Sequence, residues 1–123
     1  MYYSNSEDLA TRVQRGLDWI LTHGAEFDVD LSRVDVEEDV LWMSNATRCV
    51  LGQAAQNGPV PDVYRYYDVV DKATETAGVD SPHAWAIDHG FLIPDSGVDT
   101  WDDMADAWRE AIRAHRAAEV TGS

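Results

Sequence analysis

The chain has 123 residues, 45% of them hydrophobic and 26% charged, which is typical of one soluble globular domain. Its 23 acidic residues against 9 basic ones give a formal net charge of −14, which repels nucleic-acid phosphates and anionic membranes and attracts basic partners. No apolar run approaches the ~20 residues that a membrane span needs, and the first residues carry no secretory signal, so we expect a cytoplasmic protein.

The first predicted helix begins near Ser6, a suitable N-cap, and ends at Gly24. Its apolar residues recur at spacings of three and four, which is typical of one buried helical face: Leu9, Val13, Leu17, Ile20 and Leu21. Trp19 lies off this stripe, and we expect it to cover a neighbouring element.

Phe27, Val29 and Leu31 alternate with polar residues, and after a step of three the alternation continues with Val34 and Val36. This period is typical of extended chain, whereas aspartate is unfavourable in strands. The segment is therefore expected to be either a short strand or a packed irregular stretch. It continues through acidic residues to Asp39 before residues 40–42 return to the core.

Three further helices are predicted before the last one. The second, capped by Ser44, carries residues 49–53 and stops at residues 57–59. The third begins at Pro61 and ends at Gly78, with Val63 and Tyr67 among its inward positions. A short fourth helix follows Ser81-Pro82 and breaks at Gly90.

The last predicted helix begins with a capping box formed by Thr100 and Asp103. Its inward positions are Trp101, Met104, Ala105, Trp108 and Ile112. Aspartates cluster at its start and Arg109, Arg113 and Arg116 follow toward its end, as the helix dipole favours. The fold class is therefore mainly α, a compact bundle of four to five short helices in a single domain spanning 1–123, with frayed ends at about 1–5 and 120–123.

The stretch around Cys49 suggests packing more than chemistry. A single cysteine excludes an internal disulfide and a multi-cysteine zinc site. Cys49 near a helix N-terminus and beside Arg48 could be a nucleophile, but no histidine is locally paired with it. Its apolar neighbours favour a buried structural cysteine.

Two residues after Cys49 suggest a close approach between segments. Gly52 costs about 1 kcal/mol in a helix interior relative to alanine, so we expect it to admit another helix. Gln53 would then bond to a backbone group of a neighbouring segment. We expect six residues to form the structural motif of the fold: Cys49, Gly52, Gln53, Gly90, Phe91 and Trp108.

Neither a metal nor a cofactor is expected. A calcium loop starting at Asp28 would need glycine where Arg33 stands, an apolar residue where Asp35 stands, and glutamate in place of Asp39. An adventitious cation site remains an alternative to a solvated acidic loop. His83, Asp88 and His89 indicate a metal only weakly, and a cationic His89 at a helix C-terminus is the preferred interpretation.

The acidic residues form the candidate partner-binding set. It comprises Asp28, Asp30, Asp35, Glu37, Glu38, Asp39, Asp102, Asp103 and Asp106, with Asp99 as a further candidate. Five tryptophans and five tyrosines are many for this length, and exposed aromatic rings beside acidic groups suit a protein interface. The alternative is that the acidity serves only solubility.

Several short motifs follow one another in a familiar order: Arg15-Gly16, Trp19-Ile20-Leu21, Phe27-Asp28-Val29-Asp30-Leu31, Cys49-Val50-Leu51-Gly52-Gln53, His89-Gly90-Phe91 and Ala107-Trp108-Arg109-Glu110 with Ile112. In this order the chain resembles small uncharacterised proteins encoded by actinobacterial bacteriophages and their hosts. It departs from them at Ala54, where a leucine is expected. The resemblance implies that the chain comes from an actinobacterium or one of its phages. A composition rich in arginine and poor in lysine agrees with such a GC-rich source. The resemblance implies no activity.

These observations lead to three hypotheses. The first is a non-enzymatic interaction protein, phage-related, that binds a basic or DNA-binding host protein and in its sharpest form mimics DNA with spaced carboxylates. The second is a small-ligand binder with a pocket between the short fourth helix and the Cys49 helix. The third is a small enzyme that uses Cys49 or a pair of carboxylates.

Overall fold

The computed structural model describes residues 8–93 and 100–122, with only the backbone described for 120–122. The described chain is mainly helical, as the sequence predicted, and it contains no strand. Its elements are α1 (Leu9–His23), the 3-10 helices η1 (Gly24–Phe27) and η2 (Leu31–Arg33), α2 (Val50–Ala55), α3 (Tyr64–Ala77), α4 (Pro82–Asp88) and α5 (Trp101–Gly122). None of these helices combines the length and apolar content that crossing a bilayer requires.

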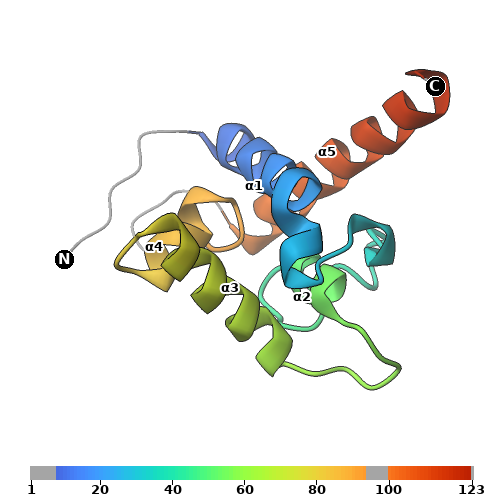
Figure 1. Cartoon of the computed structure of the whole chain (residues 1–123). Helices are drawn as coiled ribbons and strands as arrows, with labels where there is room; N and C mark the ends of the chain where they lie inside the picture. The colour runs from blue at the N-terminus through green and yellow to red at the C-terminus, as the bar shows by residue number, and fades with distance from the viewer. Residues whose placement is uncertain (1–7, 94–99, 123) are drawn as a thin grey trace.

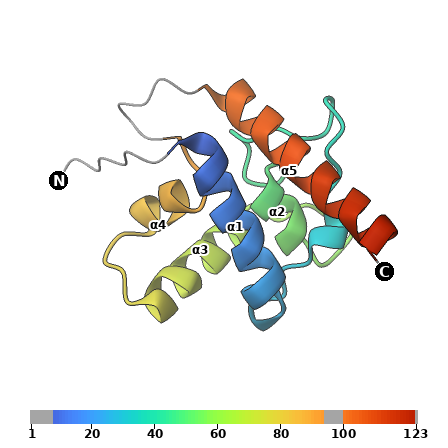
Figure 2. The same ribbon diagram turned by 90° about the horizontal axis from the view of Figure 1, so that it is seen from above.

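Helix α1 lies between α5 on one side and the α3–α4 pair on the other (Figures 1 and 2). Helix α2 is short and central, and all six of its residues are buried. It packs against α3 and against η2, which follows the acidic residues Asp28 and Asp30. The expected frayed ends fall at 1–5, outside the described residues, and at 120–123, where α5 continues to Gly122.

The start of α1 differs from the prediction. Its N-cap is Asp8, whose Oδ1 accepts a hydrogen bond of 2.8 Å from the Thr11 N–H. Ser6 lies outside the described residues. Trp19 covers a neighbour as predicted, because its ring stacks on Phe27 and meets Trp85 edge to face. Leu21, expected in the buried stripe, is exposed.

Two glycines and a tryptophan join α1, α4 and α5. The Trp108 Nε1–H donates to the Gly90 carbonyl at 2.7 Å, and the Trp108 ring stacks on Phe91. Gly90 has a φ of +74°, and a Cβ there would lie 2.8 Å from the Val13 Cα. A Cβ on Gly16 would lie 2.0 Å from the His89 carbonyl oxygen, so both close approaches require glycine.

The segment from residue 29 to residue 36 is irregular and contains η2, so the expected alternative of a short strand is not realised. The alternation nevertheless predicted its burial, since Val29, Val34 and Val36 are in the core. Side chains on helices take the place of a partner strand. Arg109 Nε donates to the Val36 carbonyl at 2.7 Å, and Arg116 Nη2 donates to the Val34 carbonyl at 2.7 Å. We name residues 27–39 the acidic segment. Two arginines that the sequence placed only near a helix end thus anchor it to α5.

Two helices begin later than the sequence indicated. Helix α2 begins at Val50 with Cys49 as its N-cap, whereas Ser44 was expected there. Helix α3 begins at Tyr64, three residues after Pro61. Val63 and Tyr67, expected inward, are exposed.

The start signals of the last two helices are confirmed. The Ser81 hydroxyl accepts from the Ala84 N–H before α4. The capping box of α5 is reciprocal: the Asp103 N–H donates to Thr100 Oγ1, and the Thr100 N–H donates to Asp103 Oδ2, each at 3.0 Å. Within α5, Met104, Ala105, Trp108 and Ile112 are buried as predicted, and Trp101 is partly exposed instead of inward.

Candidate functional site

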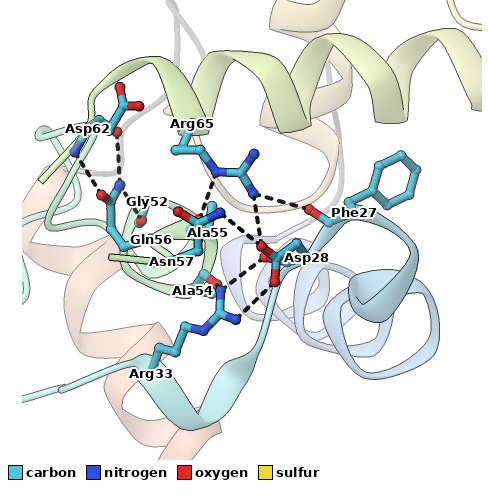
Figure 3. Close-up of polar contacts among 10 residues, drawn as sticks. All are labelled: Phe27, Asp28, Arg33, Gly52, Ala54, Ala55, Gln56, Asn57, Asp62 and Arg65. Atoms are coloured by element: carbon cyan, nitrogen blue, oxygen red, sulfur yellow. Dashed lines mark hydrogen bonds and ion pairs between the residues drawn. The ribbon is translucent and has the colours of Figure 1, made fainter. Parts of the chain in front are cut away.

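Asp28, the first residue of the candidate acidic set, belongs to a network at the end of α2 (Figure 3). Its backbone is left-handed, with a φ of 57°. Its carboxylate accepts from Arg33 Nη2 at 2.9 Å and from Asn57 Nδ2 at 3.0 Å, and Arg65 Nη2 lies 3.7 Å away. The hydrogen bonds from Arg33 and then Asn57 hold the pKa of this carboxyl below its usual value.

The same two arginines bond to the last carbonyl groups of α2. Arg33 Nη1 donates to the Ala54 carbonyl and Arg65 Nε donates to the Ala55 carbonyl, each at 3.0 Å (Figure 3). The last carbonyls of a helix have no partner within it, so these guanidinium groups supply what the helix end needs. The Asp28 carboxylate hydrogen-bonds to Arg33 and lies within ion-pair distance of Arg65, so its single negative charge faces both cations. Its charge is therefore committed to the fold.

Three other members of the acidic set bond to nearby backbone. Asp30 Oδ1 accepts from the Ser32 N–H at 2.9 Å, and hydrogen bonds from the side chain and then the backbone of Ser32 lower the pKa of the carboxyl. Asp35 Oδ1 accepts from the Glu37 N–H at 3.0 Å, and Asp103 completes the capping box of α5. Each side chain fixes a local turn or helix start. Glu37 and Asp39 are exposed, and Asp99 lies outside the described residues.

The remaining carboxylates meet in one groove with a volume of about 510 Å³ between the acidic segment and the start of α5. Glu38 contributes from the acidic segment, and Asp102 and Asp106 contribute from α5. Trp42 and Trp101 line the same groove and are 51% and 38% exposed. We name it the acidic groove, lined by Glu38, Leu41, Trp42, Met43, Ser44, Trp101, Asp102, Ala105, Asp106 and Arg109.

Only one of the three carboxylates that line this groove pairs with a cation among the described residues. Asp106 Oδ1 accepts from Arg109 Nη1 at 2.8 Å, and the Arg109 side chain is only 11% exposed because it also bonds to the Val36 carbonyl. Among the residues that the structure describes, no cation lies within ion-pair distance of Glu38 or Asp102. The groove therefore keeps a net negative charge that a basic side chain could neutralise.

Trp42 already contacts a cation of its own chain. The Arg48 guanidinium carbon lies 4.7 Å from the centre of the Trp42 ring, within the distance of a cation–π interaction. The ring remains half exposed with Arg48 in place. Trp42 therefore presents an aromatic surface of the type on which an incoming arginine or lysine packs.

Cys49 is a structural residue. It is 2% exposed, and its Sγ accepts a hydrogen bond of 3.2 Å from the Gly52 N–H at the start of α2. Burial raises the pKa of the thiol to about 12, so almost none is thiolate at neutral pH. This environment argues against covalent chemistry at Cys49.

Gly52 and Gln53 act in packing, with one difference from the prediction. A Cβ on Gly52 would lie 2.0 Å from the Ala46 carbonyl oxygen, so the glycine admits the preceding loop and not another helix. Gln53 bonds to neighbouring backbone as predicted. Its Oε1 accepts from the Asp35 N–H at 2.8 Å, and its Nε2 donates to the carbonyls of Asp35 and Arg48. Gln53 thereby ties the acidic segment to α2.

The protonation state of His89 differs from the prediction. Its Nδ1 lies 2.8 Å from the Trp85 carbonyl oxygen, which can only accept, so Nδ1 carries a hydrogen. Burial lowers the pKa of His89, and the neutral ring is favoured. The expectation of a cationic histidine at this helix end was therefore wrong. Within the described ranges 8–93 and 100–122, no three potential ligands among His, Cys, Asp and Glu gather in a metal-binding arrangement.

Sequence reasoning missed that two tryptophans share a groove with part of the acidic set. Trp101 was assigned to the core because it shares a helical stripe with Trp108, and Trp42 because apolar residues precede it. The available signal was that each adjoins candidate acidic positions or a polar loop. No protein-family model matches this chain, and no curated protein or solved structure is significantly similar to it.

Proposed function

We propose that this chain is a non-enzymatic interaction protein whose acidic groove binds a basic segment of a partner protein. The observation that carries the proposal is the meeting of Glu38 and Asp102, which have no cationic partner among the described residues, with two exposed tryptophans. Interfaces are enriched in tryptophan, and few side chains contribute most of the binding energy. Carboxylates at the edge provide specificity and steer association.

The charge of the whole chain supports the same choice of partner. A formal net charge of −14 creates a long-range field that accelerates the approach of basic proteins. The contact of Arg48 with Trp42 indicates which basic side chain suits the groove, because a guanidinium can stack on the ring while it pairs with a carboxylate. We therefore expect arginine to be preferred over lysine.

The finer form of the proposal is a phage-related accessory protein that occupies a host protein in the cytoplasm. Mimicry of DNA by the whole acidic set receives less support. Asp28 is held by Arg33 and Asn57, and neither Asp28 nor Asp30 lines the groove. A recognition patch of a few carboxylates and tryptophans fits the geometry better. The high pKa of Cys49 gives no support to an enzyme that uses this cysteine.

The test is a titration of the protein with an arginine-rich peptide at low and at high salt, and tryptophan fluorescence reports the binding. Glu38→Gln combined with Asp102→Asn removes the two carboxylates without a cationic partner and keeps the shapes of the side chains. Asp68→Asn combined with Asp71→Asn is the matched control, since both residues are exposed on α3 and outside the groove. Both double variants change the net charge equally.

We expect the groove variant to weaken binding roughly tenfold, because each lost contact contributes about 0.5–1 kcal/mol. The control should change affinity by less than about twofold, because only the screened long-range field is altered. Equal losses for both double variants would show that the peptide responds to net charge alone, and the groove proposal would then be abandoned.

A further inference from the structure

A second cleft lies on another part of the molecule, with a volume of about 380 Å³, within the usual range for small-ligand sites. It is formed by the end of α1, η1, the last turns of α3 and α4. It shares no lining residue with the acidic groove. The sequence hypothesis of a ligand pocket placed it between α4 and the Cys49 helix, but no residue of α2 lines this cleft.

Trp19, Phe27 and Trp85 form an aromatic part of the wall of the cleft. Trp19 stacks on Phe27 with ring centroids 5.5 Å apart and meets Trp85 edge to face at 5.1 Å. The His89 ring stacks on Trp85 at 4.2 Å and also lines the cleft. Rings held against one another in this way form rigid flat surfaces, and such surfaces favour a planar aromatic guest by stacking or edge contact.

The polar groups of the cleft favour a positive charge on that guest. Glu26 and Asp88 both line it. Asp88 lies 3.3 Å from Arg15, so part of its charge is balanced, whereas the partner of Glu26 is His23 at 3.0 Å, an imidazole that is charged only when protonated. The field of the whole chain adds to the preference for cations and opposes anions.

Neutral His89 completes the set. Its Nδ1 hydrogen is used by the Trp85 carbonyl, which leaves Nε2 as an acceptor on a ring that lines the cleft. A guest with an N–H group has an acceptor there, and a guest with only acceptors does not.

From these contacts we propose that the cleft binds a small aromatic molecule bearing a protonated amine. Its ring packs against Trp19 and Phe27, which Trp85 supports from behind, and its ammonium group lies near Glu26 and Asp88. The proposal is independent of the function assigned to the acidic groove.

The experiment uses three probes that share one ring: tryptamine, indole and indole-3-acetate. Each is titrated into the ¹⁵N-labelled protein while the indole N–H signals are followed by NMR. Tryptamine should bind most tightly, and indole-3-acetate should bind at least about tenfold more weakly than tryptamine, because the charge that it places near the carboxylates is negative. The signals of Trp19 and Trp85 should shift, and those of Trp42 and Trp101 should not.

A pair of variants assigns the binding to the cleft. Ala77 is exposed on the last turn of α3 and lines the cleft, so Ala77→Phe fills it without disturbing the core. Ala114→Phe places the same ring on an exposed position of α5 outside the cleft. Ala77→Phe should weaken tryptamine at least tenfold, and Ala114→Phe should leave it unchanged. The proposal is overturned if tryptamine does not bind at millimolar concentration, if indole-3-acetate binds equally well, or if Ala77→Phe has no effect.

Discussion

Gln53 offers the sharpest test of how the acidic segment is held. Replacing it by methionine keeps the length of the side chain and removes three hydrogen bonds, two to the backbone of Asp35 and one to the Arg48 carbonyl. Each such bond contributes about 1 kcal/mol net, and water can reach part of this site, so the free energy of unfolding should fall by about 2–3 kcal/mol. The loss should also accelerate hydrogen exchange at the Asp35 amide.

Urea denaturation followed by circular dichroism measures the change, with Gln14→Met as the matched control. Gln14 is exposed on α1 and makes one side-chain bond, to Asp18, so its replacement should cost less than about 0.5 kcal/mol. If Gln53→Met costs no more than the control, the three bonds contribute nothing beyond what water supplies. The account of the acidic segment would then be refuted.

Three more predictions concern the core and its titrating groups. Gly90→Ala should cost about 2–4 kcal/mol in thermal denaturation, because the new Cβ meets Val13 at a positive φ, whereas Gly58→Ala, with open space around it, should change stability little. Cys49 should react with a thiol reagent at least about 100-fold more slowly in the folded than in the unfolded protein, because burial raises its pKa to about 12. Equal rates in the two states would contradict the burial of Cys49. The pKa of His89 is lowered from 6.5 in the fold, so between the folded and the unfolded pKa the unfolded chain binds more protons. The free energy of unfolding should therefore be largest above about pH 7 and should fall as the pH drops through that window. The fall should be smaller in His89→Gln.

The helical pattern could be predicted from the sequence wherever one local signal decided it. Ser81-Pro82 predicted the start of α4, and the Thr100–Asp103 capping box predicted the start of α5. The apolar spacing predicted the buried residues of α5 with the exception of Trp101, which is exposed. Helix starts were missed at α2, where Ser44 and Cys49 are both possible caps, and at α3, where Pro61 lies three residues before the helix. Cys49 is the N-cap of α2, and the Ala46 carbonyl of the loop before it lies close to Gly52.

The acidic segment could be predicted only in part, because its partners are distant in the sequence. The alternation of apolar residues predicted which of its side chains are buried. The groups that satisfy its backbone are Gln53, Arg109 and Arg116, and no local pattern links them to residues 31–36. A segment whose carbonyls are bonded by side chains shows the same alternation as a strand.

The candidate acidic residues could be predicted only in part for a similar reason, since some of them hold the fold and others line the groove. Aspartates that look alike in the sequence differ in whether an arginine or a backbone N–H is within reach. Asp28 meets Arg33, whereas Glu38 and Asp102 have no cation within ion-pair distance among the described residues. Only the tertiary structure separates carboxylates that hold the fold from carboxylates that face an open groove.

The most direct test of the central claim is affinity capture from a cell lysate with three forms of the protein in parallel. We expect a basic protein to be retained by the wild type and by Asp68→Asn/Asp71→Asn, and to be lost with Glu38→Gln/Asp102→Asn. Retention of the same protein by all three forms would contradict the assignment of partner binding to the acidic groove.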